Sequence, residues 1–209
     1  GVANPRRKSH DGASVGMDFG LKTYLTLSDG RRIENPLFLK QGLNELRKAS
    51  RRLSKCEKGS AHRRAARLAL DRVYEDITNR RDDWQWKLAH ELCRRYDTLC
   101  VEDLQLTGMS RLWGRKMADL AFGSFVQKLE HTASKYGCNV KKVDRFYPSS
   151  KTCGCCGYVY EHLDLHDRYW TCPQCGTAID RDVNAAMNIM RQGIVSSGSP
   201  RKTKVTLRK

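Results

Sequence analysis

The sequence lacks the features of membrane and exported proteins. Its 209 residues contain no apolar run long enough to cross a bilayer and no signal-peptide pattern, so we expect no membrane partner. Acidic residues are scarce beside basic ones, 23 against 39, and the formal net charge is +16. So large an excess favours a polyanionic partner, nucleic acid above all, over a generally basic surface. With 39% hydrophobic residues, the chain can form one α/β domain and a small additional module.

Glycine and proline are absent between Gly59 and Gly108, so one helix can continue across most of that interval. Apolar residues recur there every three or four positions, and a shorter helical stripe begins at Phe38. We predict a helical hairpin over about residues 38–97, with a second helix roughly 55 Å long. Its outer faces are rich in arginine, either as a solvated surface or as a track for phosphates.

Four cysteines are isolated in helix-like and strand-like segments, which suits a reducing compartment and a cytoplasmic protein: Cys56, Cys93, Cys100 and Cys138. Four others form two Cys-x2-Cys pairs with 15 residues between the pairs: Cys153 with Cys156, and Cys172 with Cys175. This spacing predicts a closed, structural Zn²⁺ site in preference to disulfides. The ninth, Cys155, is an alternative to Cys156 as a ligand. Residues 158–171 are expected to form a small antiparallel hairpin that metal binding stabilises.

A short alternating stretch near the start of the chain predicts a core strand. Val15, Met17 and Phe19 alternate with Gly16 and Asp18, which places Asp18 on the opposite face from the three apolar side chains. An aspartate on a core strand is costly unless a cation compensates its charge, and Mg²⁺ binds carboxylate oxygens. We therefore predict Asp18 as the first ligand of a metal site.

Further acids stand where they can join Asp18. Glu102 follows the apolar core of a second predicted strand, and Asp180 and Asp182 precede an alanine-rich helical pattern. Sites in open α/β sheets form at the carboxyl ends of strands, so the acids can converge there. Taken singly, each is better explained as a solvated loop residue or, for Asp180 and Asp182, as a helix N-cap.

The motifs, taken in order, resemble a known family. Gly-Met-Asp-Phe-Gly at 16–20, Val-Glu-Asp-Leu at 101–104, Ser-Ser-Lys-Thr-Cys at 149–153, the Cys pairs, and Asp-Arg-Asp-Val-Asn-Ala-Ala at 180–186 occur in sequence. Together they resemble the C-terminal half of TnpB (OrfB) proteins, transposon-encoded relatives of type V CRISPR effectors and Fanzor proteins. The likeness covers roughly residues 14–191.

The resemblance implies an RNase H-like, RuvC-like α/β domain with a mixed sheet, into which the helical hairpin and a zinc ribbon are inserted. It divides the chain into a basic lead (1–12), a first nuclease part (13–147), the ribbon (148–180), a last helix (181–193) and a basic disordered tail (194–209).

The resemblance also implies roles for the acids. By motif, Asp18, Glu102 and Asp182 would be catalytic and hold two Mg²⁺ ions, and Asp182 is preferred to Asp180 because it directly precedes Val-Asn-Ala-Ala. The family is RNA-guided: a guide RNA pairs with target DNA, and this domain cuts the exposed strands. A Mg²⁺-dependent DNA endonuclease is therefore expected. A non-cleaving nucleic-acid clamp or repressor and a strand-joining transposase are the alternatives.

Family members usually carry an N-terminal half that binds guide RNA and reads a short duplex motif, and the sequence shows no counterpart of it. We expect either that the chain is a fragment or that a second polypeptide supplies this half. The chain alone should then lack programmed targeting, because base pairing held in the whole assembly reads the target.

Overall fold

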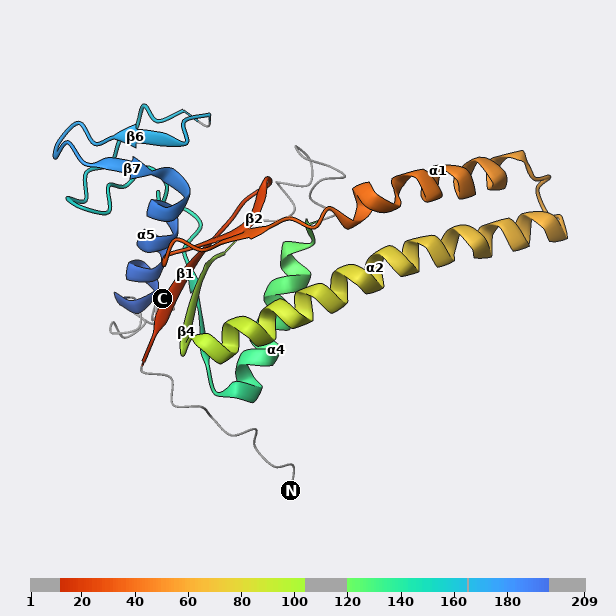
Figure 1. Cartoon of the computed structure of the whole chain (residues 1–209), viewed down its shortest axis with the longest axis horizontal. Coiled ribbons are helices and arrows are strands. Elements are labelled where there is room, and N and C mark those ends of the chain that lie inside the picture. Colours follow the sequence, from red (N-terminus) through yellow and green to blue (C-terminus); the bar gives the residue numbers. More distant parts are fainter. Residues whose placement is uncertain (1–11, 104–119, 165, 196–209) are drawn as a thin grey trace, which may run out of the picture.

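A mixed five-stranded sheet forms the body of the protein, beside a long helical hairpin (Figure 1). The computed structural model describes residues 12–103, 120–164 and 166–195. The strand order is β3-β2-β1-β4-β5. The strands are β1 (Ser14–Phe19), β2 (Thr23–Leu27), β3 (Arg32–Glu34), β4 (Thr98–Glu102) and β5 (Asn139–Val143).

The first three strands form the antiparallel meander that their turn residues favour. Gly30, at the turn between β2 and β3, has a φ of 88°, a conformation that glycine adopts without strain. Strands β4 and β5 run parallel to β1 and to each other. The predicted α/β class with a mixed sheet is confirmed.

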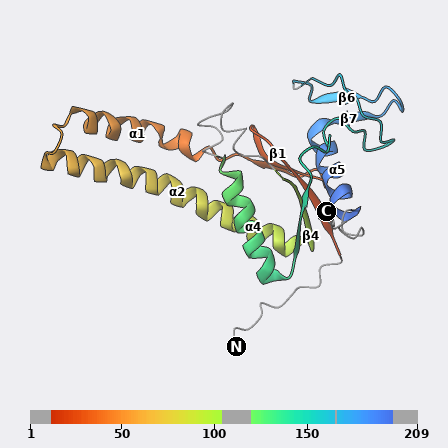
Figure 2. The same cartoon turned by 180° about the vertical axis from the view of Figure 1, so that it is seen from behind.

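Helices cover both faces of the sheet (Figures 1 and 2). The hairpin helices are as predicted, and the hydroxyl of Ser60 caps the second by accepting a hydrogen bond from the backbone N–H of Arg63. Helix α4 begins at Phe122, because Ala121 before it has a left-handed backbone conformation (φ 45°). The helices are α1 (Phe38–Lys55), α2 (Ala61–Arg95), α4 (Phe122–Tyr136) and α5 (Arg181–Val195).

Side chains of β1 alternate between the two helical layers. Val15 and Met17 are buried in the main core, which α2 and α4 complete. Phe19 packs on that side too, 4.7 Å from Phe122 between ring centroids. The opposite side of β1 faces α5, so the prediction that Asp18 points away from the apolar side chains is confirmed.

Helix α5 lies in close contact with β1 at Gly16. A Cβ at this position would overlap the carbonyl oxygen of Ala186, so only glycine allows the helix backbone to pack this near the strand. Ala185 and Ala186 are buried in the same contact, which explains the alanine-rich start of the helix. This contact sets the distance between the strand that carries Asp18 and the helix that carries Asp182.

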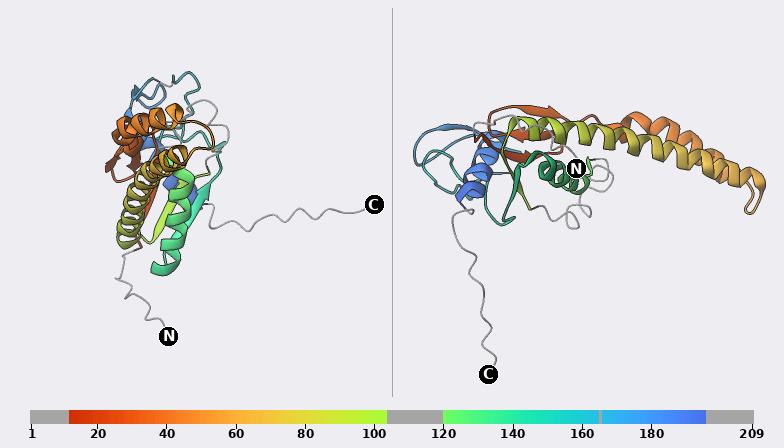
Figure 3. Two further views of the ribbon diagram at one scale, coloured as in Figure 1. Left: turned by 90° about the vertical axis from the view of Figure 1, so that its right-hand side faces the viewer. Right: turned by 90° about the horizontal axis from the view of Figure 1, so that it is seen from below.

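The hairpin of α1 and α2 projects away from the sheet (Figure 3). At 1.5 Å per residue, the 35 residues of α2 span about 52 Å. Near the C-terminal end of α2, Leu88 and Leu92 join the main core. Ala66 and Ile77 are buried farther from the sheet, toward the turn of the hairpin. Several basic side chains are engaged within the hairpin, as in the pairs Arg80–Asp76, Lys87–Asp83 and Arg95–Glu91.

The ribbon differs from its predicted form. The hairpin expected over residues 158–171 is wrong: β6 (Tyr169–Thr171) pairs instead with β7 (Ala178–Asp180), across the second cysteine pair. A separate bridge between Thr152 and Val159 encloses the first pair. Each Cys-x2-Cys turn is thus closed by its own strand contact. The predicted domain boundaries stay a prediction.

The structure also bears on the expectations about membrane spans and about the cysteines. In the described ranges, none of the helices is long and apolar enough to cross a bilayer. All nine cysteines lie within these ranges, and all are free thiols.

Replacing Gly16 by alanine should destabilise the protein by about 3 kcal/mol, because the added methyl group meets helix backbone that cannot move aside without shifting α5. Gly30→Ala is the matched control: it has open space and strains only the left-handed turn, at about 1 kcal/mol. Urea unfolding of both variants checks the ranking, and equal losses would contradict it.

Candidate functional site: an acid pocket beside a cysteine cluster

Strand register brings two of the predicted acids side by side. Parallel strands β1 and β4 pair Met17 with Val101, so the next residues, Asp18 and Glu102, are neighbours on the same face of the sheet. Both follow the buried part of their strand, at its carboxyl end. The predicted convergence of these two acids at one sheet edge is what this register produces.

The structure separates the roles of Asp180 and Asp182. Oδ1 of Asp180 accepts hydrogen bonds from the backbone N–H groups of Asp182 and Val183, both at 3.1 Å, so Asp180 caps α5. It also accepts a hydrogen bond of 2.6 Å from Arg32. The side chain of Asp182 takes no part in this cap and lines the cavity described next.

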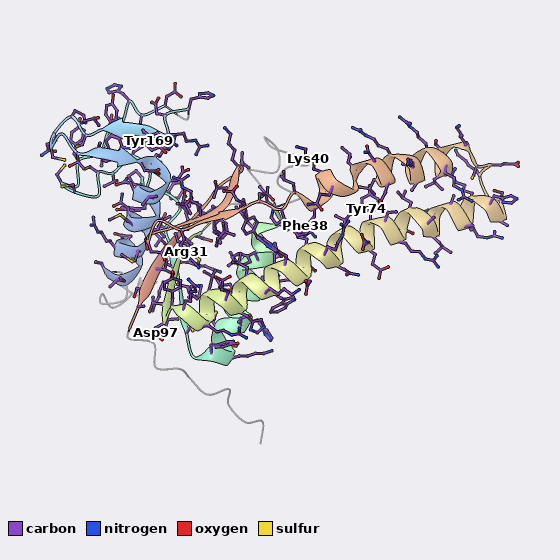
Figure 4. The ribbon with its side chains drawn as sticks, in the orientation of Figure 1. Arg31, Phe38, Lys40, Tyr74, Asp97 and Tyr169 are labelled. Atoms are coloured by element: carbon purple, nitrogen blue, oxygen red, sulfur yellow. The ribbon has the colours of Figure 1, made fainter. Side chains whose placement is uncertain are left out.

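A cavity of about 220 Å³ lies where the sheet, α5 and the ribbon meet. We call it the acid pocket, because Asp18, Asp180 and Asp182 line it. Asp18 and Asp182 line it, and Glu102, the third predicted acid, does not. Tyr169 also lines the cavity, from a ribbon strand, and this residue is 74% exposed (Figure 4). The site therefore draws on three separate parts of the fold.

The acids repel one another electrostatically. Burial, followed by the negative charges of Asp182 and Glu102, raises the pKa of Asp18 to about 8. Burial also raises the pKa of Glu102. Within the described ranges, no side chain or backbone N–H donates a hydrogen bond to the Asp18 carboxylate, although Arg181 and Arg168 lower its pKa from a distance. Such a carboxylate fits a divalent cation, because oxygen ligands of this kind are those that Mg²⁺ prefers.

Two arginines that sequence reasoning missed neutralise the neighbouring acids. Nη1 of Arg168 lies 2.9 and 3.0 Å from the two carboxylate oxygens of Asp182. Arg32 pairs with Asp180 and lies 3.9 Å from Asp182. No spacing links these arginines to the acids in the sequence; only the docking of ribbon and sheet on α5 brings them together.

The cysteine cluster is the more tightly assembled site. Its four members are Cys153, Cys156, Cys172 and Cys175, and their sulfur atoms all lie within 4.8 Å of one another. Among the described residues, no other group of three or more His, Cys, Asp or Glu side chains is as close. The carboxylates of Asp18, Glu102 and Asp182 do not meet this criterion, so they lie farther apart than the four sulfurs do.

The sulfur positions fit tetrahedral zinc. Sγ of Cys153 lies 3.7 Å from that of Cys175, and Sγ of Cys156 lies 3.7 Å from that of Cys172. A Zn–S distance of about 2.3 Å gives a tetrahedron with edges of about 3.8 Å, whereas a disulfide is about 2.0 Å long. Cys155 is exposed and outside the cluster. The four thiols can hold a structural Zn²⁺ ion.

Zinc content should distinguish the two adjacent cysteines. Wild-type protein and Cys155→Ser should each bind one Zn²⁺ per chain, whereas Cys156→Ser, which removes one of the four clustered sulfurs, should lose at least tenfold in zinc affinity. Metal analysis after dialysis against a competing chelator measures this difference. Equal retention by both variants would show that Cys155 replaces Cys156.

Asp18 should make the metal-free protein less stable as pH rises. Because folding raises its pKa from 3.8 to about 8, the folded chain keeps a proton that the unfolded chain releases, and stability falls across that window. Asp18→Asn should therefore be more stable than wild type at pH 8, by up to about 5 kcal/mol, and similar at pH 4. Urea unfolding in magnesium-free buffer measures this.

Asp29→Asn is the control of opposite sign. Partial burial opposes the shift, but hydrogen bonds from Tyr96 and Arg31 leave the pKa of Asp29 lowered. Its ionised form thus stabilises the fold above the unfolded pKa, and the substitution should cost stability at pH 8. A stability gain there would contradict the electrostatic interpretation of both sites.

Two family models match the chain in succession. The family OrfB_IS605, described as "Probable transposase", matches residues 2–112, just over half of the chain. The family described as "Cas12f1-like, TNB domain" matches residues 122–189, which include the cysteine cluster. The match to a solved CRISPR-Cas12f ternary complex has a TM-score of 0.64 at 21% identity, covering 89% of this chain and 40% of that one. It supports the fold.

Curated relatives agree with these models. A protein of Streptomyces pristinaespiralis named "Putative RNA-guided DNA endonuclease" is 41% identical over 187 residues, 88% of this chain and 46% of its own length. A Mycobacterium tuberculosis protein with the same description is 30% identical over 200 residues, 89% of this chain and 43% of its own. The chain spans just under half of each. With one model matching more than half of its length, the protein belongs to the OrfB (TnpB) family.

Proposed function

We propose that the chain is the catalytic part of a Mg²⁺-dependent, RNA-guided DNA endonuclease with an RNase H-like, RuvC-like sheet. The observation that carries the proposal is the position of Asp18, close enough to two carboxylates from other elements for their charges to raise its pKa. Asp18 on β1 and Glu102 on β4 are register neighbours, and Asp182 on α5 lines the same cavity as Asp18. The charges of Asp182 and Glu102 both act on Asp18, whose pKa rises to about 8.

The residues have distinct roles in this proposal. Asp18, which lies under the influence of both other acids, would give up its proton and serve as the shared ligand, with Glu102 and Asp182 completing the two ion sites. The chemistry that paired Mg²⁺ ions supply is activation of a water and stabilisation of the leaving 3′ oxygen in an in-line displacement. Arg32 and Arg168 line the cavity and would attract a phosphate group once Mg²⁺ takes over the charge of the acids they now pair with.

Guide RNA and target DNA are the proposed partners. The net charge of +16 and the exposed arginines of the hairpin support a polyanion. The names of the relatives support RNA guidance, and because the chain spans under half of them, residues beyond those printed here, on the same or a second polypeptide, would supply targeting.

A non-cleaving nucleic-acid clamp is the alternative, and one observation favours it. Asp182 already forms an ion pair with Arg168, so one proposed metal ligand is neutralised without an ion. Cleavage requires that Mg²⁺ compete with this arginine, whereas a clamp does not. Catalysis must therefore be tested on the acids themselves.

Asp18→Ala and Asp182→Asn should each reduce Mg²⁺-dependent cleavage of DNA by at least a hundredfold and leave nucleic-acid binding within about twofold, because they remove metal ligands and no phosphate contact. Asp180→Asn is the matched control, since asparagine still caps the helix; it should keep most activity. Nicking of labelled DNA is measured with the chain alone, and with guide RNA and an N-terminal half from a relative.

Equal cleavage by wild type and Asp18→Ala in the complete assembly would remove these acids from catalysis. Binding with no cleavage by wild type under any of these conditions would favour the clamp.

A further inference from the structure

Helix α5 is hydrogen-bonded to the ribbon through a buried asparagine. Asn184 is 6% exposed, and its Oδ1 accepts a hydrogen bond of 2.8 Å from the backbone N–H of Gly154. Its Nδ2 donates to the carbonyl of Thr152, also at 2.8 Å. Thr152 and Gly154 flank Cys153, a member of the cysteine cluster. Both polar atoms of one side chain are thus used on the backbone around a zinc ligand.

A second asparagine, one helical turn further on, repeats the contact. Asn188 is 2% exposed, and its Nδ2 donates to the carbonyls of Thr152 and Ser149, at 2.7 and 2.9 Å. Arg191 continues the same helix face by donating to the carbonyl of Gly154. Three side chains of α5 therefore follow the path of one loop, which we call the first knuckle (residues 149–154).

These hydrogen bonds require a folded knuckle. A Cβ at Gly154 would lie 2.8 Å from Oδ1 of Asn184, so the knuckle backbone approaches the helix as closely as a residue without a side chain permits. The ribbon has a core of five buried residues, two of which are cysteines of the cluster. So small a core depends on its metal for stability, so the knuckle has this shape when Zn²⁺ holds it.

The start of the same helix carries Asp182. The backbone N–H of Arg181 donates to the carbonyl of Arg168 at 2.9 Å, and its Nη1 donates to the carbonyl of Asp164 at 2.9 Å. Arg168 in turn holds the carboxylate of Asp182. Ribbon backbone is thus bonded to α5 at its first residue and again one and two turns later.

We propose that Asn184 and Asn188 are positioning residues that make the acid pocket dependent on the zinc site. The folded first knuckle holds the first turns of α5 through these hydrogen bonds, and Asp182, in the first turn, lines the same cavity as Asp18. The catalytic meaning of this coupling rests on the proposed nuclease function; the coupling itself does not.

Physical chemistry favours asparagine for this role. A buried carboxamide is costly unless its hydrogen bonds are made, so unfolding of the knuckle would leave several polar atoms of Asn184 and Asn188 without partners. The helix must then shift or open to reach water, which moves its first turn. Because coupling between two sites is reciprocal, a cation in the acid pocket should in turn tighten zinc binding.

Hydrogen exchange on the full 209-residue chain tests the coupling without any cleavage. In wild type, removing zinc should speed amide exchange in the first two turns of α5 at least tenfold. The double variant Asn184→Leu/Asn188→Leu should still bind one Zn²⁺, but its exchange in these turns should be fast with or without zinc. Asn79→Leu, an exposed asparagine of α2, is the matched control and should behave as wild type.

Should the double variant fail to fold, Asn184→Asp decides the question. Aspartate keeps the acceptor for the N–H of Gly154 but places a carboxylate oxygen against the carbonyl of Thr152, so the zinc response should be reduced and not abolished. Exchange that ignores zinc in wild type, or that responds fully in both variants, overturns the proposal.

Terbium supplies a second readout at the acid pocket. Tb³⁺ prefers carboxylate oxygens, and Tyr169 at the cavity can sensitise its luminescence; Asp18→Asn serves as the blank. Zinc removal should lower the affinity for Tb³⁺ at least tenfold in wild type. In the double variant it should change that affinity by less than twofold. An unchanged Tb³⁺ affinity in zinc-free wild type counts against the coupling.

The two proposals fail separately. Zinc-dependent exchange and Tb³⁺ binding without Mg²⁺-dependent cleavage would end the nuclease proposal and leave the coupling intact. Cleavage by a chain whose α5 exchange ignores zinc would do the reverse. Absence of Tb³⁺ binding would count against the metal site of the nuclease, while hydrogen exchange still decides the coupling.

Discussion

The contact of α5 with β1 is the constraint on which the rest of the structure depends. Gly16 lets the helix backbone lie directly on the strand, and the residue two positions later is Asp18. The same helix carries Asp182 in its first turn and binds the first knuckle through Asn184. Sheet, acid pocket and cysteine cluster are therefore three parts of one packed unit, joined by the contacts that α5 makes with β1 and with the first knuckle.

Local patterns carried much of this arrangement. Alternation around Asp18 predicted its strand and its face, the glycine- and proline-free interval predicted α2, and the Cys-x2-Cys spacing predicted the cluster that the structure assembles. These features depend on the period of a strand, the period of a helix and the ligand geometry of a metal, all of which leave marks within a few residues.

The remaining features depend on docking, which leaves no such mark. Arg168 contacts Asp182 only because the ribbon folds back on α5. In so basic a sequence, nothing near Arg168 distinguishes it from the other arginines. The pairing of β6 with β7 was missed because aromatic residues between the cysteine pairs suggested a hairpin there. Asp180 and Asp182 were both possible caps, and hydrogen-bond geometry alone gave the role to Asp180.

The projecting hairpin has a consequence for the mechanics of the molecule. Near its C-terminal end α2 joins the main core through Leu88 and Leu92, but toward the turn of the hairpin the described part of the chain places no strand beneath it. Its resistance to opening is therefore graded along its length, from that of the whole body to that of an isolated pair of helices. The tip can fray and re-form while the end packed against the sheet stays closed, so the hairpin opens most readily at its turn.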